Sequence, residues 1–136
     1  EVINWVRLIF PDFRAQMCGL QWGEWYNSYR DKQFDPKKLE TQVASMMSDV
    51  EVQKKPGIYA YLITGDEKYL NLRGFDAAQR AEAYERQKGI CGHCKEHFAF
   101  AEMEADHITP WSAGGKTVPE NCQMLCVTCN RKKGNK

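Results

Sequence analysis

Apolar residues recur with helical spacing through most of the first half of the chain. One stripe is aromatic and predicts a helix with a single apolar face; it consists of Trp22, Trp25, Tyr26 and Tyr29. A second stripe follows the pair Asp35-Pro36, which suits an N-cap and a first helical position; it consists of Leu39, Val43, Met46, Met47 and Val50. Residues 1–74 are therefore predicted to be a mostly helical region. Its stripes fit core packing better than a base-stacking surface.

The pattern changes after residue 75. Asp76 can cap an alanine-rich helix that continues to about residue 88, where Gly89 would end it. Short segments with glycines, paired cysteines and one strand then follow. Thr117 and Glu120 would suit a capping box at a short turn. A last short helix is expected to begin at about Thr128.

Length and composition exclude several classes of protein. Hydrophobic residues make up 43% of the chain and charged residues 27%, which is typical of a soluble globular protein. The apolar run Ile58–Ile63 predicts a strand or a short buried helix. Its length is far below the ~18 residues that a membrane span needs. Val2–Phe10 contains Asn4 and Arg7, so it is a poor secretory signal. We expect a cytoplasmic protein with no membrane partner.

The charge distribution gives only weak information about partners. A net charge of +1 does not indicate a nucleic-acid binder. Basic residues do gather at the end of the chain, at Arg131, Lys132, Lys133 and Lys136. Such a tail is most often a solvated terminus, although it can also contact phosphates.

Two Cys-x-x-Cys pairs predict a structural zinc site. Zn²⁺ prefers four ligands in a tetrahedron, and the two pairs supply four thiolates, from Cys91, Cys94, Cys126 and Cys129. A closed coordination sphere leaves no place for water, so this ion would stabilise a small domain rather than catalyse. His93 and His97 could substitute as ligands but are interpreted as bystanders, and Cys122 as a small buried residue. A redox role for Cys91 and Cys94 is the alternative.

The segment between the pairs contains residues suited to phosphodiester hydrolysis. Asp106 offers a hard oxygen ligand for Mg²⁺ or Mn²⁺, the cations that neutralise charge developing on a phosphate. His107 comes next and would point to the other side of an extended strand, free to act as a general base. Asn130 directly follows Cys129, so the zinc site should hold its amide oxygen near Asp106. These residues predict a metal-dependent catalytic site.

The motif that joins these residues resembles the HNH endonuclease family. It reads Glu-x-Asp-His-Ile-x-Pro-Trp-Ser-x-Gly-Gly-x-Thr, then Glu-Asn, then Cys-x-x-Cys-Asn-Arg-x-Lys. The resemblance implies an α+β protein in which residues 75–136 form a ββα-metal HNH finger with a four-cysteine zinc, preceded by the helical region 1–74. It also implies an enzyme that hydrolyses DNA with Mg²⁺ or Mn²⁺.

The resemblance further implies roles for single residues. His107 corresponds to the general base and Asp106 to the adjacent metal ligand. Asn121 corresponds to the middle Asn, which braces the loop and orients the base, and Asn130 to the third position as a metal ligand. The expected DNA contacts are Arg131 and Lys133, together with Lys132 and Lys116.

The first half resembles the C-terminal part of bacterial proteins that fuse a ParB-like domain to an HNH domain, some of them in restriction or phage defence. Because the chain starts at Glu1, we expect it to be a fragment, with a regulatory domain or self-association elsewhere. A catalytically silent zinc module that binds nucleic acid is the alternative function. DNA specificity, and nicking as opposed to double-strand cleavage, stay open.

Overall fold

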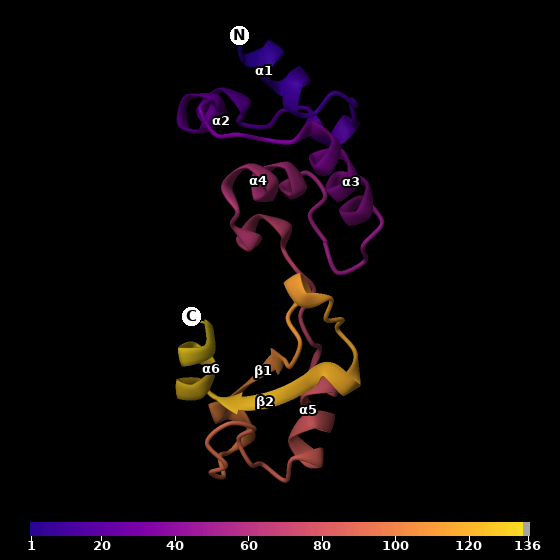
Figure 1. Ribbon diagram of the computed structural model, residues 1–136. Helices are drawn as coiled ribbons and strands as arrows, with labels where there is room; N and C mark the ends of the chain where they lie inside the picture. Colours follow the sequence, from indigo (N-terminus) through magenta and orange to yellow (C-terminus); the bar gives the residue numbers. More distant parts are fainter. Residues whose placement is uncertain (135–136) are drawn as a thin grey trace. The chain divides into compact units, whose positions relative to one another are not determined.

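The computed structural model describes residues 1–134, so Lys136 of the predicted basic tail lies outside the described residues. The chain divides into two compact units, Glu1–Leu72 and Arg73–Lys136. Figure 1 shows helices alone in the first unit and a strand pair with helices in the second. Among the described residues, none of the helices is long and apolar enough to cross a membrane.

The first unit is built from short helices. These are α1 (Val2–Ile9), α2 (Trp22–Tyr29), α3 (Pro36–Met47) and α4 (Gly57–Thr64), with 3-10 turns at Ala15–Met17 and Glu67–Leu70. The aromatic stripe does form α2. Asp35 caps α3 through hydrogen bonds to the N–H groups of Lys37 and Lys38, as predicted. The second apolar stripe is shorter than predicted. Helix α3 ends at Met47, and Val50, the last predicted member of the stripe, is 73% exposed.

Helix α4 forms the centre of the first unit. The apolar run Ile58–Ile63, for which the sequence allowed either a strand or a short buried helix, forms this helix. Its residues Ile58, Tyr59 and Ile63 are fully buried. Gly57 begins the helix against the backbone of Tyr69, where an added Cβ would lie 1.7 Å from the Tyr69 carbonyl oxygen. A helix that is apolar on all sides must be covered on all sides, and the unit's other elements pack around it.

The second unit contains a β-hairpin between two helices. Its elements are α5 (Ala77–Arg86), β1 (Met103–His107), β2 (Cys122–Cys126) and α6 (Val127–Gly134), with 3-10 turns at Phe100–Glu102, Trp111–Ala113 and Pro119–Asn121. Asp76 caps α5 in a capping box with Gln79, so the predicted start is confirmed. The helix ends at Arg86, two residues before the predicted end. The predicted α+β class, with a ββα element after a helical region, is confirmed.

Candidate metal-dependent active site

The two strands pair in antiparallel register and give the hairpin two different faces. Asp106 lies opposite Gln123, and His107 lies opposite Cys122. Successive side chains on a strand point to opposite faces, so Glu104 and Asp106 share one face while Ala105 and His107 share the other. The second face packs on α5 through a core of Ala83, Met103, Met124 and neighbouring residues. The side chains of Asp106 and His107, although adjacent in sequence, therefore lie in different surroundings.

The first face is acidic and is covered by α6. Asn130 donates a hydrogen bond of 2.8 Å from Nδ2 to Oε1 of Glu104. Lys133, one turn further on, forms an ion pair with Asp106 and donates a 3.0 Å bond to the His107 carbonyl. Gln123 donates a 2.9 Å bond from Nε2 to the same oxygen of Asp106. Two carboxylates and the side-chain amide of Asn130 thus gather where α6 meets the hairpin.

The placement of Asn130 differs in detail from the expectation. Its amide was predicted beside Asp106, and the structure bonds it to Glu104, the next side chain along the same face. Glu104 was part of the quoted motif without a role of its own. The i, i+2 spacing of Glu104 and Asp106 on a strand was the signal that could have paired them. The donor set of this face, Glu104, Asp106 and Asn130, consists of the hard oxygens that Mg²⁺ and Mn²⁺ prefer.

His107 is held on the opposite face by two contacts. Its ring lies against Phe75, with centroids 4.3 Å apart and planes at 33°. Its Nε2 lies 2.9 Å from the hydroxyl oxygen of Thr117. Sequence reasoning did not connect either residue to His107, because both are distant in the chain and neither has a catalytic side chain.

Thr117 also corrects a prediction. The N-cap of the 3-10 turn Pro119–Asn121 is Val118, which makes no side-chain hydrogen bond to the turn. Thr117 and Glu120 therefore do not form a capping box there. The Thr117 hydroxyl instead donates to the carbonyl of Arg73 at 3.2 Å and meets His107. Its side chain is buried between these two groups rather than free to cap the turn.

Asn121 holds together the loop that joins the two strands. Its Oδ1 accepts a 2.7 Å bond from the N–H of Thr109, and its Nδ2 donates to the carbonyls of Thr109 at 2.9 Å and Lys116 at 2.8 Å. The loop is so tight that a Cβ on Gly115 would lie 1.7 Å from the Thr109 carbonyl oxygen. Because this loop carries Thr117, Asn121 acts on the surroundings of His107 without touching it.

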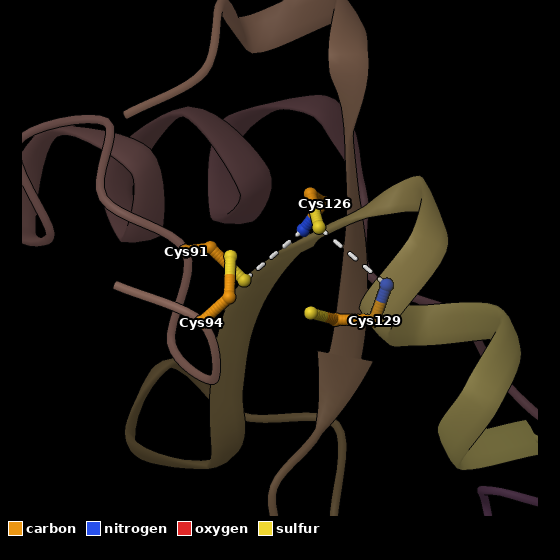
Figure 2. A group of neighbouring side chains, drawn as sticks. All are labelled: Cys91, Cys94, Cys126 and Cys129. Atoms are coloured by element: carbon orange, nitrogen blue, oxygen red, sulfur yellow. Dashed lines mark hydrogen bonds between the residues drawn. The ribbon is translucent and has the colours of Figure 1, made fainter. Parts of the chain in front are cut away.

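The four paired cysteines form one cluster at the other end of the hairpin (Figure 2). Their sulfur atoms all lie within 4.8 Å of one another. Backbone N–H groups point at the sulfurs: those of Cys126 and His93 lie 3.4 Å from Cys91 Sγ, and that of Cys129 lies 3.4 Å from Cys126 Sγ. Such donors favour thiolates, and four converging thiolates suit tetrahedral zinc.

The electrostatics of Cys91 agree with this fit. Burial opposes ionisation of its thiol, but hydrogen bonds from the backbone of Cys126, Cys94 and His93 outweigh burial and lower its pKa to about 6. A thiol that ionises near neutral pH is ready to bind a metal ion. None of the six cysteines, all of which lie within the described residues, forms a disulfide bond.

Residues 91–136, from the first cysteine of the cluster to the end of the chain, match the HNH endonuclease family. This part of the chain is therefore similar to HNH endonuclease domains. The match includes the hairpin, the cysteine cluster and α6, whereas Phe75 and α5, which contact the second face, precede it.

Two curated proteins are similar to a larger part of the chain. One is the CRISPR-associated endonuclease Cas9 of Corynebacterium diphtheriae, 28% identical over 99 residues, which are 70% of this chain and 9% of that protein. The other is the type IV methyl-directed restriction enzyme EcoKMcrA of Escherichia coli, 27% identical over 101 residues, 70% of this chain and 31% of that protein. The chain thus spans less than a third of either relative. No solved structure matches it.

The other residues predicted for the site lie around the hairpin and α6. Arg131, Lys132 and Lys116 are exposed, whereas Lys133 is half-buried against Asp106. A cavity of about 410 Å³ opens beside the cysteine cluster; it is lined by Gly92, His93, Gln123, Leu125, Cys129, Lys132 and Lys133. His97 is exposed and outside the cluster, and Cys122 is buried away from it.

Proposed function

We propose that this protein is a divalent-metal-dependent endonuclease that hydrolyses DNA phosphodiester bonds. The observation that carries the proposal is the adjacency of Asp106 and His107 on opposite faces at the end of β1. One side presents oxygen donors, with Glu104 and Asn130 beside Asp106. The other presents an imidazole in a fixed orientation. Hydrolysis of a phosphodiester needs these two chemistries within reach of one phosphate.

The residues divide the work as follows. Asp106 and Asn130, with Glu104 nearby, would hold Mg²⁺ or Mn²⁺, which when bound neutralises charge on the phosphate. His107 accepts a proton from the attacking water. Arg131, Lys132 and Lys116 are exposed and would contact neighbouring phosphates, as basic side chains do on DNA. Lys133 is paired with Asp106 and would act closer to the reaction centre than these three.

The cysteine cluster would hold a zinc ion in a structural role. Cys126 ends β2 and Cys129 lies in the first turn of α6, so the cluster sets where α6 begins. Asn130 comes directly after Cys129 and reaches back to Glu104. A change in the cluster would therefore move the oxygen donors as well as destabilise the unit.

We also propose a role in bacterial restriction or anti-phage defence. The printed names of both relatives support it, since one is CRISPR-associated and the other a restriction enzyme. Both alignments are longer than the second unit, so each includes part of the helical unit as well. The link to proteins with a ParB-like domain stays a prediction.

The test is cleavage of supercoiled plasmid by the purified chain in Mg²⁺, Mn²⁺ or EDTA. We expect cleavage with either cation, none in EDTA, and at least a hundredfold loss in His107→Ala, because a general base contributes about 10²–10⁴ in rate. His97→Ala is the matched control, since His97 is exposed outside both faces of the site. DNA binding without cleavage by the wild type in every metal would favour the non-catalytic zinc module instead.

A further inference from the structure

Thr117 is the polar side chain that meets His107, and it is only 2% exposed. We propose that Thr117 is a positioning residue that fixes the tautomer of His107, leaving Nδ1 as the nitrogen that accepts a proton. The proposal rests on the proposed function, because it names how the base of that site is prepared. Thr117 is the last residue in the first segment of the quoted motif, and the sequence suggested only a capping role for it.

The direction of the hydrogen bonds leads to the tautomer. The Thr117 hydroxyl lies 3.2 Å from the carbonyl oxygen of Arg73, and a carbonyl can only accept. The hydroxyl proton therefore points at Arg73, and the Thr117 oxygen turns a lone pair to Nε2 of His107, 2.9 Å away. A contact at this distance requires a proton between the two atoms, so Nε2 carries it. In a neutral imidazole the other nitrogen, Nδ1, then has the lone pair.

Neighbouring contacts keep both partners in place. The ring of His107 is stacked on Phe75, which restricts its rotation. Thr117 is held through its own carbonyl, which accepts a 3.4 Å bond from Nε2 of Gln79 on α5. On its other side, Asn121 bonds the carbonyl of Lys116. The hydroxyl therefore faces His107 because two separate elements anchor the backbone around it.

The chemical step then follows with protons balanced. Water gives one proton to Nδ1 of His107, and its oxygen forms the new bond to phosphorus. The bond from phosphorus to the leaving sugar oxygen breaks, and that oxygen takes a proton from solvent. Nε2 keeps its proton and its bond to Thr117 throughout, so the imidazolium is formed without a change of hydrogen-bond partner. With the opposite tautomer, Nδ1 would carry a proton and could not act as the base.

The decisive measurement is the nitrogen-15 NMR spectrum of the zinc-loaded full chain with labelled histidines, recorded without DNA. There are three histidines, and loss of one signal pair in His107→Ala assigns the residue. In alkaline buffer, where the imidazole is neutral, we expect the wild-type spectrum to show Nε2 protonated and Nδ1 unprotonated at His107. Thr117→Val should give a mixture of tautomers, and Thr117→Ser should restore the wild-type pattern. A wild-type His107 with the proton on Nδ1 overturns the proposal.

A kinetic measurement provides the second arm. Thr117→Val should lower kcat about tenfold with little change in KM, which is the size of one lost hydrogen bond at the base, and Thr117→Ser should recover most of it. Thr41→Val is the matched control, because Thr41 also donates its hydroxyl to a backbone carbonyl but lies on α3. Equal kcat in Thr117→Val and the wild type contradicts the proposal. If the chain cleaves nothing, the proposed function fails while the NMR spectrum still decides the tautomer.

Discussion

Asn130 of α6 and Glu104 of β1 are joined by a hydrogen bond of 2.8 Å between Nδ2 and Oε1. This bond connects Asn130, which directly follows the last cysteine of the cluster, to the acidic face of the hairpin. Lys133, one turn later, reaches Asp106 on the same face. The helix that the cysteines anchor is thus also the helix that organises the oxygen donors, so stability and chemistry are coupled through α6.

The first prediction concerns the metal dependence of cleavage. Asp106→Asn removes the charge of the carboxylate that we propose as a metal ligand, and it should lower kcat about a hundredfold and raise the Mn²⁺ concentration needed for half-maximal rate. The measurement is a metal titration of plasmid cleavage. Asp31→Asn is the control, because Asp31 is exposed in the first unit. An unchanged metal titration in Asp106→Asn would remove this residue from the cation site.

A second prediction concerns the cysteine cluster. Cys126→Ser should reduce bound zinc to well under one ion per chain and cost at least about 3 kcal/mol, lowering the Tm of the second unit by more than about 10 °C. Metal analysis and thermal melting measure the two effects. Cys18→Ser, at an exposed cysteine outside the cluster, should change neither. A wild-type chain without zinc but with a reversible Cys91–Cys94 disulfide would support the redox alternative.

The third prediction concerns the loop between the strands. Asn121→Ala removes three side-chain hydrogen bonds to the loop backbone and should cost about 1–3 kcal/mol in the free energy of unfolding. Cleavage should fall as well, since the loop positions Thr117 against His107. Urea unfolding and plasmid cleavage measure the two effects. Asn27→Ala, at an exposed site on α2, is the comparison. Stability equal to the wild type would mean that the loop holds itself without Asn121.

The fourth prediction concerns pH and the first unit. Arg14 donates two hydrogen bonds, of 2.9 and 2.6 Å, to the carboxylate of Glu40, and this contact lowers the pKa of Glu40 below its usual 4.5. A lowered carboxyl pKa adds stability above pH 4.5 that disappears as pH falls through the folded-state pKa. Glu40→Gln should therefore cost about 1 kcal/mol at pH 7 and much less near pH 3.

Tryptophan fluorescence during urea unfolding can follow this unit, which contains Trp5, Trp22 and Trp25. Glu24→Gln is the control, because Glu24 is exposed on α2. A stability difference between Glu40→Gln and the wild type that is the same at pH 7 and pH 3 would show that the ion pair is not its source.

Local signals in the sequence predicted the local structure well. Asp35-Pro36 and Asp76 mark helix starts because their side chains bond the first free N–H groups of their own helices. The four cysteines were expected to converge because two such pairs together supply the four ligands of one zinc ion, and their sulfur atoms do converge. The errors lie where distant contacts compete with local ones. Thr117 suited a capping box by spacing, but its hydroxyl is used by Arg73 and His107.

The short-range features of this protein follow from its amino-acid sequence alone: the helix caps, the cysteine pairs and the order Asp-His on one strand. These depend on backbone groups and ligands only a few residues apart. Which groups those residues contact depends on how the elements pack together. Glu104 is hydrogen-bonded to Asn130, Asp106 forms an ion pair with Lys133, and His107 is hydrogen-bonded to Thr117. Hairpin register and helix packing bring together these residues, which no spacing rule connects.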